Sequence, residues 1–228
     1  MKTEGKTAIV LGATGLTGKH VLQLLLRDAH YGKITSLARN PLGWAHPKLK
    51  EVQGDLLKLQ ERADLFGVDD VFCCIGTTRA KTPNKERYRD IDFGIPATAA
   101  RLAKENGAAC FLVISALGAN AKSTFFYSRI KGEMEIAVLR QNMERTFILQ
   151  PGLIGGNREE RRTAEHLFKK IMGALHFLLL GPLRKYRIIA PEHIAQAMVW
   201  LANHRHGEAR IPSDNIRKLA EKYVKTGS

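Results

Sequence analysis

The sequence predicts an α/β protein, built on a doubly wound parallel sheet with helices on both faces. Short, almost continuously apolar runs recur along the first two-thirds of the chain, as is typical of strands buried in a parallel sheet. Stretches of helical length and pattern separate these runs. Because crossovers between parallel strands are right-handed, this alternation favours a doubly wound topology.

Each expected strand is an apolar run bounded by polar residues, glycine or proline. In chain order the runs are TAIVLG (7–12), KITSLAR (33–39), the weaker LKEVQG (49–54), DVFCCIG (70–76), CFLVISA (110–116) and TFILQP (146–151). The expected helices cover 15–27, 86–106, 124–141, 192–203 and 213–223. Gly107 follows AKEN and suits a helix C-cap.

Residues 1–228 are expected to form a single domain, with a core over 1–150 and a small lobe over 151–228 packed on the core. The alternation of strands and helices stops after Pro151, where GLIGGNREERR (152–162) is rich first in glycine and then in charge. The chain of 228 residues is long enough to bury a substantial core.

The formal net charge of +14 is compatible with nucleic acid, anionic membrane or phosphorylated small molecules as partners. The basic residues are spread along the chain, at 79–89, 158–162, 169–170 and 184–187. No RNA-binding signature or DNA-reading helix accompanies them. We therefore expect a solvated basic surface and no specific nucleic-acid partner.

We expect a cytoplasmic protein with no membrane span. The most apolar later run, IMGALHFLLLG (171–181), is shorter than the roughly 20 residues that cross a bilayer. The wider segment 168–187 fits either an amphipathic membrane-surface element or an apolar face packed on the sheet or a pocket. Three cysteines without Cys-x-x-Cys spacing indicate neither a disulfide framework nor a metal site.

A glycine-rich turn joins the first strand to the first helix. In VLGATGLTGKH the glycines are Gly12, Gly15 and Gly18, which allow a tight turn and close approach of the backbone to a ligand. The following helix offers free N–H groups and a partial positive charge to a pyrophosphate. The spacing Gly-x-x-Gly-x-x-Gly differs from the usual dinucleotide fingerprint, and a turn that serves only packing is the alternative.

Arg39 stands at the end of the second strand, where an NAD-specific site usually places a carboxylate. A guanidinium suits the 2′-phosphate of NADP instead. We therefore expect NADPH to be preferred over NADH. A solvent-exposed arginine without a ligand is the alternative.

Tyr127 and Lys131 are four residues apart in STFFYSRIKGEMEIAV (123–138) and share one helix face. A nearby ammonium stabilises tyrosinate, so we expect a lowered pKa for Tyr127. Ser115 ends a strand upstream, at the sheet edge where ligands bind, and its hydroxyl could hydrogen-bond a substrate carbonyl. About 0.4 such Tyr/Lys pairs arise by chance in this composition, so each residue also has an ordinary structural interpretation.

Together these features resemble an atypical short-chain dehydrogenase/reductase, most closely the Tat-interacting-protein-like branch. The resemblance rests on GATGLTG (12–18), Arg39, GDLL (54–57) and CCIGTTR (73–79). It extends through KERYRDIDF (85–93), VISALGANAKSTFFYSRIKGEME (113–135), LQPGLIGGNREERR (149–162) and LRKYRIIAPEHIAQAM (183–198).

The resemblance implies a single NAD(P)-binding domain of Rossmann type that binds NADPH and reduces a small carbonyl substrate by hydride transfer. Residues 1–150 would be its dinucleotide-binding core and 151–228 its substrate or partner lobe. Ser115, Tyr127 and Lys131 would be the catalytic residues. The implied cofactor contacts include Tyr127 and Lys131. The others are Gly12, Thr14, Gly15, Leu16, Thr17, Gly18, Arg39, Asp55, Leu56, Ile75, Gly76, Thr77, Pro151, Gly152 and Ile154. The family often has an asparagine in the preceding helix, where this chain offers Asp92.

A second function stays open at this point. Proteins of this branch resemble NADPH-binding regulators that act through protein partners with little turnover. Both interpretations use the same residues, so the sequence does not separate them. The apolar helix faces are also compatible with a homodimer.

Overall fold

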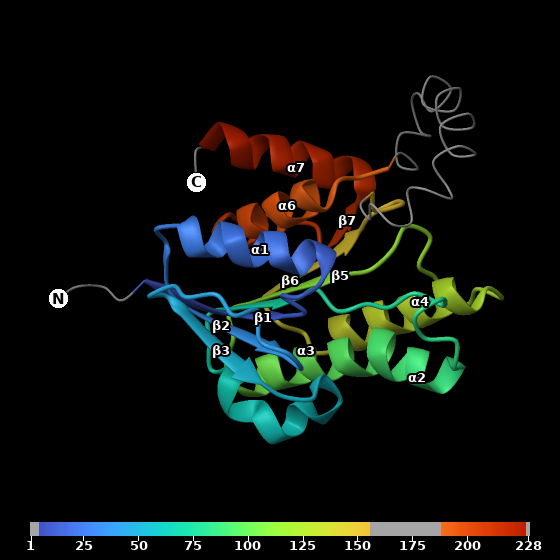
Figure 1. The fold of residues 1–228 in the computed structure, drawn as a ribbon. Helices are drawn as coiled ribbons and strands as arrows, with labels where there is room; N and C mark the ends of the chain where they lie inside the picture. Colours follow the sequence, from blue (N-terminus) through green and yellow to red (C-terminus); the bar gives the residue numbers. More distant parts are fainter. Residues whose placement is uncertain (1–4, 156–187, 227–228) are drawn as a thin grey trace, which may run out of the picture.

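A computed structural model describes residues 5–155 and 188–226 of the chain. They form a seven-stranded sheet in the order β3-β2-β1-β4-β5-β6-β7, and every neighbouring pair of strands is parallel (Figure 1). The strands are β1 (Lys6–Leu11), β2 (Tyr31–Ala38), β3 (Leu49–Gln53), β4 (Asp70–Cys73), β5 (Cys110–Ile114), β6 (Arg145–Gln150) and β7 (Arg210–Pro212). The predicted fold class and the six predicted strands are confirmed.

Helices cover both faces of the sheet. In Figure 1, α1 (Leu16–Arg27), α6 (Pro191–Asn203) and α7 (Ser213–Thr226) lie on one face. The 3₁₀ helix η1 (Leu56–Phe66), α3 (Ile95–Glu105) and α4 (Phe126–Leu139) lie on the other. The shorter α2 (Lys85–Arg89) and η2 (Asp90–Gly94) lead into α3.

The strands are apolar throughout because both faces of the sheet are covered. Along β1, Ala8 and Val10 join the core beneath α1, α6 and α7, while Ile9 and Leu11 join the core on the other face. All four side chains are at most 1% exposed. Successive side chains of a strand point to opposite faces, so two cores require apolar residues at every position.

The helix predicted over 86–106 is interrupted by one π-helical turn, η2, between α2 and α3. Pro96 explains the interruption, because proline has no N–H and its ring clashes with the carbonyl four residues earlier in an α-helix. The N–H of Ile95 instead donates to the carbonyl of Asp90, five residues back. Such π turns often occur at functional sites, and this one contains the buried Asp92.

The described C-terminal residues extend the same sheet. Strand β7 is only three residues long, too short for a sequence pattern, and Ile211 is its buried residue. It pairs with β6, and α6 and α7 pack beside α1. The division of the chain between 150 and 151 stays a prediction.

The segment 168–187, the basic clusters at 158–162, 169–170 and 184–187, and most of GLIGGNREERR lie outside the described residues. In the part of the chain that is described, no helix is both long and apolar enough to cross a membrane.

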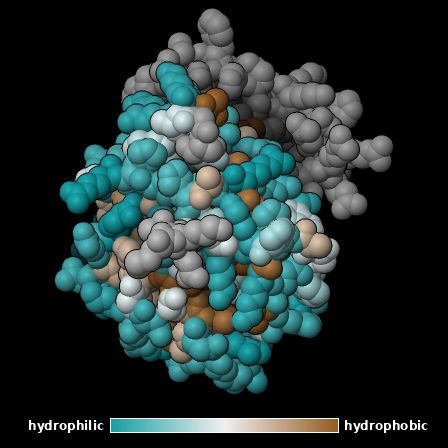
Figure 2. All heavy atoms as spheres, turned by 90° about the vertical axis from the view of Figure 1, so that its left-hand side faces the viewer, coloured by the Kyte–Doolittle hydropathy of each residue, from teal (hydrophilic) through white to brown (hydrophobic). Residues whose placement is uncertain are grey.

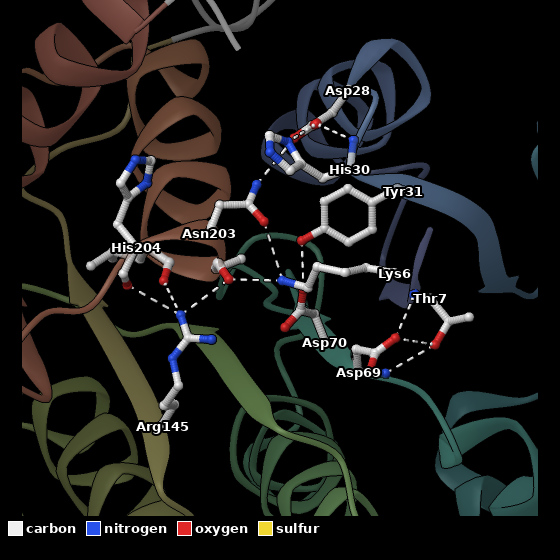
Figure 3. Close-up of polar contacts among 12 residues, drawn as sticks. Lys6, Thr7, Asp28, His30, Tyr31, Asp69, Asp70, Arg145, Asn203 and His204 are labelled. Carbon is white, nitrogen blue, oxygen red and sulfur yellow. Dashed lines mark hydrogen bonds and ion pairs between the residues drawn. The ribbon is translucent and has the colours of Figure 1, made fainter. Parts of the chain in front are cut away.

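A polar network at the amino ends of the strands ties α6 to the sheet (Figure 3). Asp70 is fully buried, and one of its oxygens receives the ammonium of Lys6 and the hydroxyl of Tyr31, each at 2.5 Å. Lys6 also donates to Asn203, at the end of α6. Burial raises the pKa of Asp70 more than the charge of Lys6 lowers it.

The face turned to the viewer in Figure 2 corresponds to the left-hand side of Figure 1, where the N-terminus lies. It is mostly hydrophilic, and apolar atoms show only in small patches. The predicted site residues lie at the opposite ends of the strands.

Candidate functional site

The predicted site residues lie at the carboxyl edge of the sheet. Because all strand pairs are parallel, the carboxyl ends of the strands meet at one edge. Strand order reverses around β1, whose neighbours are β2 and β4, and ligands bind at such a switch point in open α/β sheets. The predicted residues that follow these strands are Gly12 after β1, Arg39 after β2, Asp55 after β3, Ile75 after β4, Ser115 after β5 and Pro151 after β6.

The glycine turn has the backbone geometry of a phosphate cradle. Gly12 has a φ of +85°, and the N–H of Gly15 donates to the carbonyl of Gly12 at 2.9 Å. A Cβ on Gly18 would lie 2.1 Å from the Gly12 oxygen, so no larger residue fits where α1 meets the turn. Thr17 is buried beside Gly18, whereas Thr14, Gly15 and Leu16 are exposed at the tip.

Helix α1 begins after this turn with its first N–H groups available. Gly15 is the N-cap, no side chain caps it, and the first turn has no acidic residue. These free donors and the positive end of the helix suit a pyrophosphate. The tight turn and the exposed tip therefore fit a dinucleotide.

Arg39, Asp55 and Leu56 lie at the ends of β2 and β3. The guanidinium of Arg39 is exposed and makes no hydrogen bond or ion pair within residues 5–155 and 188–226. Asp55 caps η1 by accepting the N–H of Leu57 at 3.1 Å, and Leu56 is half-buried. Arg39 is thus available to a ligand, whereas the Asp55 carboxylate already has a structural partner.

A buried ion pair links the helix that carries the Tyr/Lys motif to η2. Lys131 and Asp92 are 4% and 1% exposed, and Lys131 Nζ lies 2.8 Å from Asp92 Oδ1. The other oxygen of Asp92 accepts the N–H of Thr77 at 2.8 Å. A Cβ on Gly76 would lie within 4 Å of both charged groups. The structure therefore brings three residues together beyond the carboxyl end of β4: Thr77, Asp92 and Lys131.

Burial alone lowers the pKa of Lys131, but the neighbouring charges of Asp92 and Tyr127 outweigh it and the pKa is raised. From the sequence, the only side chain expected to interact with Lys131 is Tyr127. The direct role of Asp92 follows only from the tertiary structure, because η2 turns this carboxylate towards α4.

Tyr127 lies in the first turn of α4 and is 47% exposed. Burial of part of the ring raises its pKa, Lys131 lowers it, and Asp92 raises it again. The net direction is upwards, so the expected lowering is wrong. Burial is the largest cause, and the charge of Asp92, which pairs with Lys131, adds to it.

Ser115 is turned towards α4. Its hydroxyl donates to Glu135 Oε1 at 2.6 Å, and the side chain is 3% exposed. Glu135 is also buried, and it accepts from Gln150 and from Arg210, each at 2.8 Å. Ser115 thus has a protein partner in place of a substrate carbonyl.

Sequence reasoning missed this network, although one signal was present. Glu135 stands in the apolar stretch GEMEIAV (132–138), and a carboxylate in such a run is usually paired when buried. Its partner Arg210 is 75 residues away in β7, which had no strand signal.

Gly132 allows α4 to lie against the loop that follows β5. A Cβ there would come within 2.1 Å of the Ala121 nitrogen and 2.3 Å of the Asn120 carbonyl carbon. The N–H of Asn120 donates to the carbonyl of Ser128 at 2.9 Å. This close contact positions the turn of α4 that carries Lys131.

The segment after β6 closes the edge of the site. Pro151 is buried, and its carbonyl accepts the N–H of Leu117 at 2.8 Å. Gly152 and Ile154 are half-buried, and Ile154 forms a parallel bridge with Ile189. Their contact with a cofactor stays a prediction.

A cavity of about 440 Å³ opens beside Tyr127. It is lined by residues 77–79, Tyr88 and residues 125–127, and its exposed lining is mainly apolar. Thr77 and Tyr127 belong both to this lining and to the predicted cofactor contacts. The cavity is therefore adjacent to the expected position of the nicotinamide.

Comparison with known proteins agrees with this arrangement. The family described as NAD(P)H-binding matches residues 12–166. Protein HTATIP2 of Rattus norvegicus is 34% identical over 178 residues, which cover 76% of this chain and 73% of that protein. The mitochondrial protein FMP52 of Candida albicans is 35% identical over 159 residues, covering 68% of this chain and 69% of that protein.

Solved structures show the same fold at low sequence identity. The enzyme WbmH of Bordetella bronchiseptica, in complex with NAD⁺, superposes with a TM-score of 0.67 at 17% identity, over 98% of this chain and 82% of WbmH. A UDP-N-acetylglucosamine 4-epimerase from Methanobrevibacter ruminantium gives a TM-score of 0.66 at 15% identity, over 96% of this chain and 81% of the epimerase.

The family match over residues 12–166 includes the glycine turn, the residues that follow β1 to β6, and α4. The chain therefore belongs to the NAD(P)H-binding family, in the atypical short-chain dehydrogenase/reductase branch that includes HTATIP2 and FMP52.

Proposed function

We propose that the protein is an NADPH-dependent reductase of small carbonyl compounds. One observation carries this proposal: Tyr127 is half-exposed at a cavity, next to a buried ammonium that is held in place by Asp92. This arrangement offers a proton donor to a ligand in the cavity and a positive charge that acts on that donor. The donor can protonate a carbonyl oxygen, and the charge stabilises the tyrosinate that forms.

The glycine turn would hold the pyrophosphate, and Arg39 would bind the 2′-phosphate. Arg39 supports a preference for NADPH because its guanidinium has no other partner in the described residues. When bound, NADPH would supply the hydride that passes to the carbonyl carbon and would leave as NADP⁺.

The phenol of Tyr127 would give its proton to the carbonyl oxygen, so that the carbonyl compound becomes an alcohol. Lys131 would stabilise the tyrosinate left behind, and its pairing with Asp92 keeps the ammonium charged. Because Tyr127 is 47% exposed, it could recover a proton from water after each turnover. For Ser115 to polarise the carbonyl, its hydroxyl must first leave Glu135.

The test is NADPH oxidation with a broad panel of aldehydes and ketones, comparing wild type with Tyr127→Phe. Turnover should fall at least 100-fold, at the lower end of what general acid catalysis contributes. NADPH affinity should change less than about threefold, because the ring and Lys131 remain. Tyr223→Phe in α7 is the matched control and should leave both quantities unchanged. Full activity of Tyr127→Phe would exclude Tyr127 as the proton donor.

A second function, NADPH-dependent regulation through protein partners, is favoured by the state of Ser115. The Ser115 hydroxyl is already bonded to Glu135, and the raised pKa makes Tyr127 a weaker acid. Both features hinder catalysis, and neither hinders cofactor binding. Tight NADPH binding without oxidation across the panel would favour this function over the reductase.

We also propose a cytoplasmic location and a homodimer. The fungal relatives carry mitochondrial in their names, so mitochondria are the competing location. Subcellular fractionation distinguishes the two locations, and sedimentation of the purified protein gives the oligomeric state.

A further inference from the structure

The cavity beside Tyr127 has an aromatic wall. Tyr88 and Phe126 meet edge to face, with ring centroids 5.6 Å apart. Phe125 is 76% exposed, so a large apolar side chain stands in solvent at the same cavity. Aromatic rings favour edge-to-face or offset contact with another ring. The wall is therefore suited to a planar, apolar ligand group.

One side of the same cavity is cationic. Arg79 lines it, is exposed, and forms no ion pair or hydrogen bond within the described part of the chain. The surrounding segment 77–90 contains five basic and two acidic residues. Of the basic residues, Arg89 is already paired with Glu133. Arg79 is thus available for an anionic group, for which a guanidinium offers bidentate hydrogen bonds.

We propose that this cavity binds an aromatic carbonyl compound that carries a carboxylate, with the ring against Phe125 and Phe126 and the carboxylate at Arg79. This inference rests on the proposed reductase function, because it takes the ligand to be the substrate of that reaction. Tyr127, on the same lining, would then face the carbonyl group. A volume of about 440 Å³ accommodates a compound of one or two rings.

The experiment compares 4-carboxybenzaldehyde with benzaldehyde, by NADPH oxidation and by calorimetric binding of each compound to the protein saturated with NADP⁺. The variants are Arg79→Ala and Phe125→Ala, both at exposed positions where folding is not at risk. Arg140→Ala, at the exposed end of α4 away from the cavity lining, is the matched control.

Wild type should bind and reduce the carboxylated aldehyde about tenfold better, the factor that corresponds to about 1.4 kcal/mol. Arg79→Ala should remove this difference and leave benzaldehyde within twofold. Phe125→Ala should weaken both aldehydes, and Arg140→Ala should change neither.

Equal kcat/KM and equal binding of the two aldehydes in wild type would overturn the inference while the reductase function stood. Selective, Arg79-dependent binding without NADPH oxidation would support the anion-binding cavity while the reductase function failed. NADPH binding itself weakened tenfold by Arg79→Ala would assign Arg79 to the cofactor and overturn the inference.

Discussion

Replacing Asp92 by Asn tests whether the buried pair with Lys131 stabilises the fold. The side chains of both residues are at most 5% exposed, and the two charged groups are 2.8 Å apart. Removing one partner of such a pair costs about 3–5 kcal/mol, because the other charge stays buried without compensation. Asparagine keeps the shape and can still accept the Thr77 N–H, so we expect the lower end, about 3 kcal/mol.

The stability that Asp92→Asn loses should depend on pH, because Lys131 gains or loses its proton. In wild type its folded pKa is raised, so the pair stabilises the protein fully below the unfolded pKa of about 10.4 and less as pH rises through the folded pKa. In Asp92→Asn the largest raising influence disappears and burial lowers the pKa of Lys131. Lys131 then loses its proton at lower pH, and the difference between variant and wild type should shrink between pH 7 and pH 10.

Urea unfolding followed by circular dichroism measures the free energy of unfolding at each pH. For a chain of this size, a loss of 3 kcal/mol corresponds to a fall in Tm of roughly 6–12 °C. Asp90→Asn is the matched control, since Asp90 is exposed in the same turn, and it should change stability by less than about 0.5 kcal/mol.

A double variant tests whether the loss of stability comes from the unpaired charge of Lys131. Asp92→Asn with Lys131→Met removes the uncompensated charge and should recover much of the loss. The reasoning would be refuted if Asp92→Asn lowered the free energy of unfolding by less than about 1 kcal/mol and no more than Asp90→Asn does. That result would show that Lys131 is hydrated or paired elsewhere.

Two further predictions concern the glycine contact and the cofactor. Gly132→Ala should destabilise by about 1–3 kcal/mol in urea unfolding, because its Cβ meets the backbone of Asn120 and Ala121. At Gly94 a Cβ would meet only the Arg89 carbonyl oxygen, at an ordinary contact distance of 4.0 Å. Gly94→Ala should therefore be neutral or stabilising, and equal behaviour of the two variants would contradict the packing argument. Arg39→Ala should raise the Kd of NADPH about tenfold to 100-fold, the equivalent of a lost charged hydrogen bond, and leave NADH within twofold by fluorescence titration. Lys33→Ala, exposed at the other end of β2, is its control, and an equal effect on both cofactors would remove the 2′-phosphate role.

The sequence by itself determined six of the seven strands and the edge of the sheet at which the candidate site lies. Runs such as TAIVLG are apolar at every position because both faces of a parallel strand are buried, and that pattern is local. Once the strands are parallel, residues that follow them must share one edge, so Gly12, Arg39 and Ser115 could be placed without coordinates. The family relationship also follows from the chain order of these motifs.

Only the tertiary structure decided which charges meet at that edge. Asp92 reaches Lys131 because Pro96 forces a π turn, and Ser115 is held by Glu135, which β7 supplies with Arg210. These partners are 39, 20 and 75 residues apart in the chain. Local patterns carry no information about such distant pairs, and a pKa depends on the sum of all charges and burial around a group. The raised pKa of Tyr127 is therefore a property of the fold, although Tyr127 and Lys131 are adjacent in the helical pattern.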